Sequence, residues 1–201
     1  MQKYSLEFCF KGSRNYVQGP DIFDAVIDKL KTQFNMEELS EIKYSAHEML
    51  HTNANMIIMK DFNKDYFERI NSVITFRKEN IKYYIVVSET EDKIGCSTDY
   101  SEETVRLKSI LNGNIITFEN ELEDSITEII VSMNKYFLQE TVTKNGKWIV
   151  TKFEYKEVIN MENIKHKELK LELTNNFNNK LTKSTIFVNS CPVGYLYFSL
   201  I

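Results

Sequence analysis

The feature of this sequence that most constrains its fold is a pair of apolar helical stripes, one in each half of the 201-residue chain. Within 21–34, and again within 125–138, apolar residues recur at intervals of three and four, which places them on one face of a helix. The stripes are Ile22, Phe23, Val26, Ile27, Leu30 and Phe34, and then Ile126, Ile129, Ile130, Met133 and Phe137. Because an apolar stripe must be covered by another element, the sequence predicts two buried helices.

Strand-like segments surround the two stripes in the same order. One segment precedes each helix and several follow it, rich in aromatic and β-branched residues or alternating between apolar and polar. The expected strands are 4–11, 41–50, 54–60, 73–78 and 81–89 in the first half, and 115–118, 147–158, 166–174, 183–189 and 193–200 in the second. The residues at 79–82 predict a tight turn between two of these strands. The predicted class is α+β, with two halves that each contain a strand, a helix and antiparallel strands.

The starts of the two helices carry recognisable signals. Gly19 and Pro20 precede the first helix, where proline suits the first helical position. The run from Ser125 to Glu128 is a capping box that opens the second helix. Superimposing the helices gives weak identity, so the repeated order of elements is the stronger indication of a duplication. The aligned pairs are Ile22 with Ile126, Val26 with Ile130, and Leu30 with Asn134.

A third amphipathic pattern lies between the halves. It spans 101–111 and is followed by Asn112-Gly113, a favourable helix C-cap. The predicted organisation is a first half over 1–98, a linker helix within 99–113 and a second half over 114–201.

The charge balance argues against nucleic-acid binding. The formal net charge is −4 and the isoelectric point is near 5.5. No block of lysine and arginine longer than a residue or two is present, whereas nucleic-acid binders present a basic face. No apolar run approaches the roughly 20 residues of a membrane helix. We therefore expect neither a nucleic-acid partner nor a membrane segment.

The cysteines predict no covalent or metal framework. Cys9, Cys96 and Cys191 are odd in number, far apart and form no CxxC pair, so neither a zinc ribbon nor a disulfide framework is indicated. The first residues read as a strand and not as a signal peptide. A reducing cytoplasm is the expected compartment.

A strand, a long helix and a set of antiparallel strands wrapped around it resembles the hotdog fold, and two such units in one chain resemble a double hotdog. That superfamily includes acyl carrier protein dehydratases and acyl-CoA thioesterases. The resemblance implies binding of an acyl thioester or a similar apolar ligand, in an apolar tunnel between the two helices.

A local motif strengthens the resemblance. The dehydratases enter the central helix with a glycine and, five residues later, an acidic residue followed by alanine. Here Gly19 is followed by Asp24 and Ala25, and Glu128 occupies the equivalent position in the second half. The resemblance implies Asp24 and Glu128 as catalytic candidates, near helix N-termini that favour negative charge. Ligand-binding candidates are Arg14, Asn15, Tyr16 and Gly19.

The sequence also departs from the dehydratase pattern. The family's catalytic histidine stands nine residues before the glycine, where this chain has Phe10, and no histidine lies in 13–18 or 112–127. Dehydration needs a group that takes and returns a proton near neutral pH. A thioesterase needs only a carboxylate and a water, so thioesterase-like hydrolysis is favoured over dehydration if the chain is an enzyme.

Each of these candidates also has a structural interpretation. Asp24 shares its helix with Asp21 and Asp28, as on a solvated face, and Glu128 is explained as a capping partner. The residues at 14–16 fit a plain turn as well as a ligand loop.

A zinc site is the sharpest alternative. His47, Glu48 and His51 match HExxH, which on a helix binds zinc with both histidines and uses the glutamate as a general base. The surrounding residues predict strand and turn instead. In an extended chain the two histidines lie about 13 Å apart, too far to share one ion.

Three functions therefore stay open. The first is a double hotdog that binds an acyl thioester, with thioesterase-like activity. The second is a non-catalytic scaffold of acyl metabolism whose pocket is filled by phenylalanine and tyrosine, and the third is a zinc metallopeptidase. No motif predicts a cofactor, and homo-oligomer formation is left open.

Overall fold

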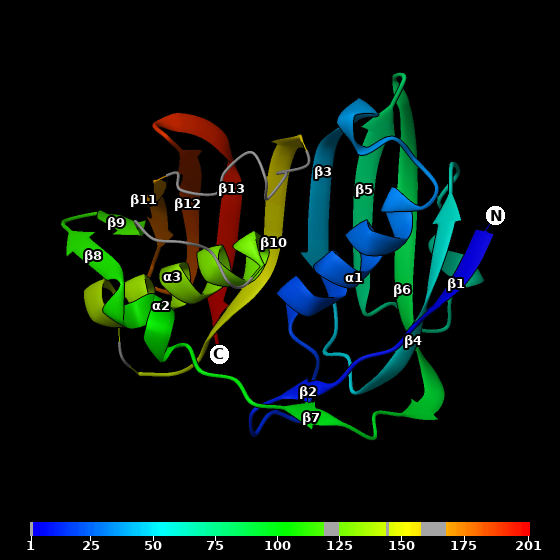
Figure 1. The fold of residues 1–201 in the computed structure, drawn as a ribbon, viewed down its shortest axis with the longest axis horizontal. Helices are drawn as coiled ribbons and strands as arrows, with labels where there is room; N and C mark the ends of the chain where they lie inside the picture. Colours follow the sequence, from blue (N-terminus) through cyan, green and yellow to red (C-terminus); the bar gives the residue numbers. More distant parts are fainter. Residues whose placement is uncertain (1, 119–124, 144, 158–167) are drawn as a thin grey trace. The chain divides into compact units, whose positions relative to one another are not determined.

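The computed structural model describes residues 2–118, 125–143, 145–157 and 168–201, and its internal contacts divide the chain into two compact units, Met1–Ser101 and Glu102–Ile201. Each unit contains one long helix and a set of antiparallel strands (Figure 1). The chain is therefore an α+β protein, as the sequence predicted. None of the helices in the described ranges is long and apolar enough to cross a membrane.

The first unit begins with strands and places its long helix early. In chain order its elements are β1 (Gln2–Leu6), β2 (Phe10–Lys11), α1 (Gly19–Lys31), the 3-10 turn η1 (Met36–Glu38), β3 (Leu39–Ala46), β4 (Thr52–Met59), the 3-10 turn η2 (Lys64–Tyr66), β5 (Ser72–Lys78), β6 (Ile81–Lys93) and β7 (Ser97–Thr98). The sheet order is β1-β4-β6-β5-β3, and β2 pairs separately with β7. Glu79 and Asn80 both have positive φ, so the predicted tight turn joins β5 to β6.

Burial of the first helical stripe supplies the core of this unit. Val26 and Leu30 of α1 are fully buried, and Figure 1 shows α1 crossing one face of the sheet. The strands direct alternate residues towards that face, including Ile42 and Tyr44 of β3 and Ile74 of β5. Each fully buried aliphatic side chain contributes about 1.5–3 kcal/mol relative to exposure, so the stripe dominates the stability of the helix.

The second unit repeats the plan after a short helix. Its elements are α2 (Glu103–Leu107), β8 (Ser109–Asn112), β9 (Ile115–Phe118), α3 (Ile126–Thr141), β10 (Trp148–Glu157), β11 (Leu169–Phe177), β12 (Leu181–Val188) and β13 (Cys191–Leu200). Residues 158, 166 and 167 of the predicted strands lie outside the described residues. Ser125 caps α3 by accepting a hydrogen bond from the backbone N–H of Glu128, as the capping-box pattern predicted.

The two units arrange their strands alike but connect them differently. In the second unit the order is β9-β11-β12-β13-β10, with β8 outside β9. There the last strands follow one another as adjacent hairpins. In the first unit, residues 60–71 lead from β4 to β5, which pairs with β3 and not with β4. The next strand, β6, then lies between β5 and β4 and pairs with both.

The helix predicted over 101–111 is wrong in its second half. The structure ends α2 at Leu107 and forms β8 from Ser109, which pairs with β9 around Gly113. The apolar residues of this segment do not form one buried stripe, because Val105 is buried whereas Leu107 and Ile110 are exposed. Asn-Gly is both a helix C-cap signal and a hairpin signal, and here the hairpin forms.

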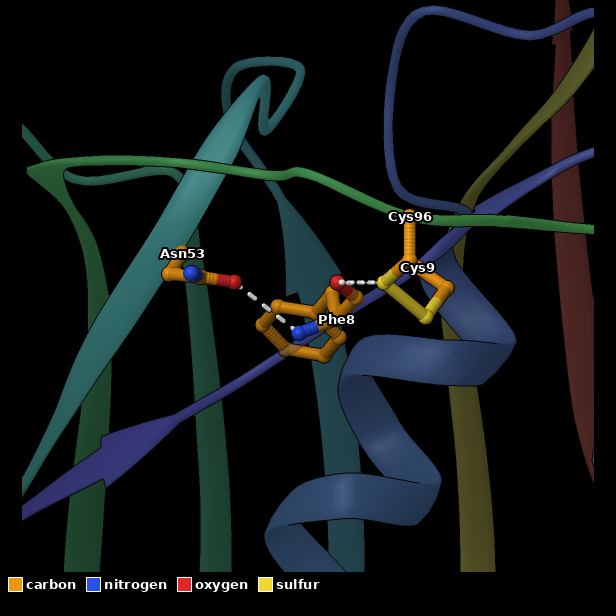
Figure 2. Close-up of a disulfide and its surroundings, with 4 residues drawn as sticks. All are labelled: Phe8, Cys9, Asn53 and Cys96. Carbon is orange, nitrogen blue, oxygen red and sulfur yellow. Dashed lines mark hydrogen bonds between the residues drawn. A yellow bond between two sulfur atoms is a disulfide. The ribbon is translucent and has the colours of Figure 1, made fainter.

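The expectation that the cysteines form no disulfide is also wrong. Cys9 and Cys96 are bonded, with their Cα atoms 4.8 Å apart and a sequence separation of 87 (Figure 2). Cys191 is free and exposed. Spacing in the sequence cannot reveal this pair, because it is the β2–β7 pairing that brings the two segments together.

A polar contact interrupts the core of the second unit at the one mismatched position of the helical alignment. Asn134 of α3 is fully buried, and its side-chain oxygen accepts a 2.8 Å hydrogen bond from the hydroxyl of Ser184 on β12. Among the described residues, the Asn134 amide nitrogen and the hydroxyl of the neighbouring inward residue Thr182 have no hydrogen-bond partner. Leu30 fills the matching position in α1 without any polar atom.

We expect Ser184→Ala to lower the free energy of unfolding by about 1–3 kcal/mol, because it leaves the buried Asn134 oxygen without its donor. The double variant N134L/S184A removes both partners and should unfold at or above the wild-type denaturant midpoint. Urea unfolding followed by circular dichroism measures both. An unchanged midpoint for Ser184→Ala would contradict the role given to this hydrogen bond.

Candidate functional site

The start of α1 gathers most of the residues that the sequence singled out. Arg14, Asn15 and Tyr16 lie in the loop between β2 and α1, and Gly19 is the first residue of the helix. Gln18 occupies the N-cap position without a side-chain capping hydrogen bond. The first N–H groups of a helix have no intrahelical acceptor and attract anions and carbonyl oxygens. The loop therefore lies beside a helix N-terminus, whose partial positive charge is opposed by an acidic side chain in the first turn.

The loop is held from a second side by the connection between β3 and β4. Val17 forms an isolated bridge with Leu50, and its N–H donates to the Leu50 carbonyl at 2.8 Å. The ring nitrogen Nδ1 of His51 lies 2.7 Å from the carbonyl oxygen of Asn15. The structure thus brings the predicted ligand loop and the predicted zinc motif to the same place.

The zinc motif does not form a helix. Residues 47–51 are the irregular connection between β3 and β4, where Glu48 pairs with Arg69 and Arg69 also contacts Glu89. The backbone N–H of His47 donates to the carbonyl of Asn71. HExxH chemistry needs both histidines on successive turns of one helix, so the zinc peptidase interpretation lacks its structural basis. The described part of the chain contains no group of three metal-ligating side chains.

Charged and aromatic residues that the sequence did not single out complete the region. Lys11 forms a 2.7 Å ion pair with Asp21 in the first turn of α1, and both side chains are less than a quarter exposed. The guanidinium of Arg14 lies over the ring of Tyr100, 4.6 Å from its centroid, and the Lys11 ammonium lies 5.4 Å from the same ring. Asp21 was visible in sequence as a first-turn acid, but nothing in the sequence linked Lys11 or Tyr100 to it.

Tyr44 of β3 is fully buried and is a neutral phenol. Burial raises the pKa of its hydroxyl strongly, the nearby Ser72 hydroxyl opposes the shift, and the Asp21 carboxylate raises the pKa further. Because a phenolate here would be both desolvated and close to a negative charge, Tyr44 stays protonated throughout the physiological range.

The two catalytic candidates lie near the starts of their helices. Asp24 is half-buried on the second turn of α1, and Glu128 is half-buried on the first turn of α3. Asp28, one turn further along α1, is exposed and forms an ion pair with Lys31. The solvated-face interpretation therefore describes Asp28 better than Asp24, and the catalytic roles of Asp24 and Glu128 remain predictions.

Comparison with solved structures finds a similar fold in a thioesterase and in dehydratase domains. A candidate thioesterase II from Thermobifida fusca matches with a TM-score of 0.59 and 5% identity, covering 99% of this chain and 92% of that one. The dehydratase domain of PpsC from Mycobacterium tuberculosis, in complex with C12:1-CoA, matches with a TM-score of 0.54 and 8% identity over 99% and 92%. A monomeric dehydratase domain from a trans AT polyketide synthase split module matches with a TM-score of 0.53 and 8% identity over 100% of both chains.

These neighbours are hotdog-fold proteins, and the chain has the double hotdog fold that the sequence predicted. At such low identity the likeness establishes the fold and leaves the chemistry open. The sequence matches no protein-family model, and no curated protein matches it.

We expect Asp21→Asn to lower the free energy of unfolding by about 1 kcal/mol, because it removes a partly buried ion pair and a negative charge at a helix N-terminus. Asp28→Asn on the same helix is the matched control and should change it by less than about 0.5 kcal/mol, since its ion pair is exposed. Chemical denaturation measures both variants. Equal effects would show that the Lys11–Asp21 pair has no special role.

Proposed function

We propose that the protein binds an acyl thioester of the acyl-CoA or acyl carrier protein class. The observation that carries the proposal is the whole-length fold likeness to thioesterases and dehydratases, one of them in complex with an acyl-CoA. The start of α1 supports it, because uncapped helical N–H groups, Lys11 and Arg14 suit a thioester carbonyl or a phosphate.

Hydrolysis of the thioester is the reaction that we propose, with one candidate carboxylate in each unit. Asp24 or Glu128 would accept a proton from a water molecule as it attacks the thioester carbonyl. The carbon–sulfur bond then breaks, and the thiolate leaves and takes up a proton. Helix N–H groups would stabilise the negative charge that develops on the carbonyl oxygen. This chemistry needs no histidine.

Dodecanoyl-CoA tests both parts of the proposal. Isothermal titration should show saturable binding, and release of coenzyme A should be measurable as free thiol. We expect Asp24→Asn or Glu128→Gln to reduce turnover about 100-fold or more, the range of a general base, while Asp28→Asn leaves turnover unchanged. Absence of binding to this and to shorter acyl-CoAs would rule out the proposed ligand class. Binding without turnover would instead favour a non-catalytic scaffold.

The position of His51 favours a second candidate, dehydration of a hydroxyacyl thioester. The sequence placed no histidine in the loop before α1, yet His51 reaches that loop from the β3–β4 connection. If its Nδ1–H donates to the Asn15 carbonyl, Nε2 is left free to accept a proton. A backbone carbonyl that fixes a histidine tautomer in this way is a common arrangement for a general base.

A pair of matched histidine variants tests this candidate. With a 3-hydroxyacyl-CoA as substrate, His51→Asn should abolish formation of the conjugated enoyl thioester, which is followed by its absorbance. His47 lies in the same connection, and its described hydrogen bond is made by the backbone N–H and not by the ring. The variant His47→Asn should therefore retain the activity. Wild-type protein that forms no enoyl product would eliminate dehydration.

A further inference from the structure

The disulfide between Cys9 and Cys96 is accessible to a reductant. Cys96 is exposed and lies between Gly95 and Ser97, which are also exposed, whereas Cys9 is half-buried. Thiol–disulfide exchange requires a thiolate to reach one of the two sulfur atoms, so access at Cys96 allows it. The Cys96 sulfur also lies 3.4 Å from the carbonyl oxygen of Phe8, which can accept the thiol proton after reduction (Figure 2).

Among the described contacts, the segment over residues 95–99 is held by the disulfide and by a short strand pairing. β2 and β7 are two residues long each, and the bonds beside their pairing run from Phe10 N–H to the Cys96 carbonyl at 3.0 Å and from Gly12 N–H to the Thr98 carbonyl at 2.8 Å. Residues 95–99 are all exposed, so they bury little apolar surface. A pairing this short is only marginally stable without the covalent bond.

The chain around Cys9 is held more firmly than the chain around Cys96. The N–H of Phe8 donates to the side-chain oxygen of Asn53 on β4 at 3.0 Å, and the ring of Phe8 is buried (Figure 2). Opening the disulfide would therefore release the Cys96 side before the Cys9 side.

The released side carries a residue of the candidate site. Tyr100 lies two residues after β7, against the guanidinium of Arg14 and the ammonium of Lys11, and Lys11 pairs with Asp21 at the start of α1. Gly12 has a φ of +59°, and a β-carbon there would lie 3.8 Å from the Tyr100 carbonyl oxygen. The disulfide thus helps to hold Tyr100 against Lys11, which in turn pairs with Asp21 at the start of α1.

We propose that Cys9–Cys96 is a reversible redox site, opened by a dithiol reductant, that controls the order of the loop before α1. One thiolate of the reductant attacks the Cys96 sulfur, the sulfur–sulfur bond breaks, and Cys9 leaves as a thiolate that takes up a proton. The second thiol of the reductant then displaces Cys96 as a thiol. The protein gains two electrons and two protons, and the reductant becomes a disulfide.

Hydrogen exchange of the full chain without any ligand tests the proposal, in a Cys191→Ser background so that only one cysteine pair can react. On reduction with dithiothreitol, the amides of Phe10 and Gly12 should exchange at least about tenfold faster, because their acceptors lie on the released segment. The amide of Val17, which donates to Leu50, is the internal control and should keep its rate. Reoxidation should restore the original rates. The variant C9S/C96S should behave as the reduced form under all conditions.

Three results would overturn the proposal: identical exchange in the two redox states, acceleration throughout the unit, or failure of dithiothreitol to expose both thiols to maleimide. The second result would make the disulfide a structural staple and not a switch. Tyr100→Ala should accelerate exchange at Gly12 even with the disulfide intact, because it removes the contacts with Lys11 and Arg14. Since no acyl thioester enters these measurements, their outcome is independent of the proposed function.

Discussion

The structure depends on the burial of one apolar helical stripe in each half of the chain. Val26 and Leu30 of α1 and Ile130 of α3 have no exposed surface or almost none, and the strands that follow each helix direct alternate side chains towards it. A sheet with one covered face tolerates polar residues on the other, which accounts for the alternation along β11 and β12. The register of the strands that cover the helices is fixed by the same requirement, because a shift of one residue would turn the apolar side of a strand outward.

The need to bury the helical stripe constrains where the strands lie more strongly than how the chain connects them. Both units place a strand of the same direction at each equivalent position around the helix, although the first unit reaches its central pair by the 60–71 connection and the second by successive hairpins. It also tolerates a local exception. Asn134 replaces an apolar residue at a fully buried position because Ser184 supplies a hydrogen bond to its side-chain oxygen.

The candidate site is built from segments that are distant in sequence. The loop before α1 is contacted by the β3–β4 connection through His51 and Leu50, and by the segment after β7 through Tyr100. The disulfide fixes the second of these contacts covalently. If the disulfide is the redox site that we propose, its reduction would act on this loop, whereas the buried stripe of α1 depends on contacts with the sheet.

The sequence by itself determined the class, the two helices, the capping of α3 and most strands, because these follow from local periodicity and local hydrogen bonding. It also placed Arg14, Asn15 and Tyr16 in the loop before the first helix and Gly19 at its start. Only the tertiary structure decided that Cys9 meets Cys96, that His51 reaches Asn15, and that Lys11 pairs with Asp21 beside Tyr100. The helix expected over 101–111 failed for a related reason: Ser109–Asn112 pairs with β9, and that pairing overrides a local preference shared by helix ends and hairpin turns. Contacts between distant segments depend on how the sheet folds over the helix, and no spacing within one segment records that.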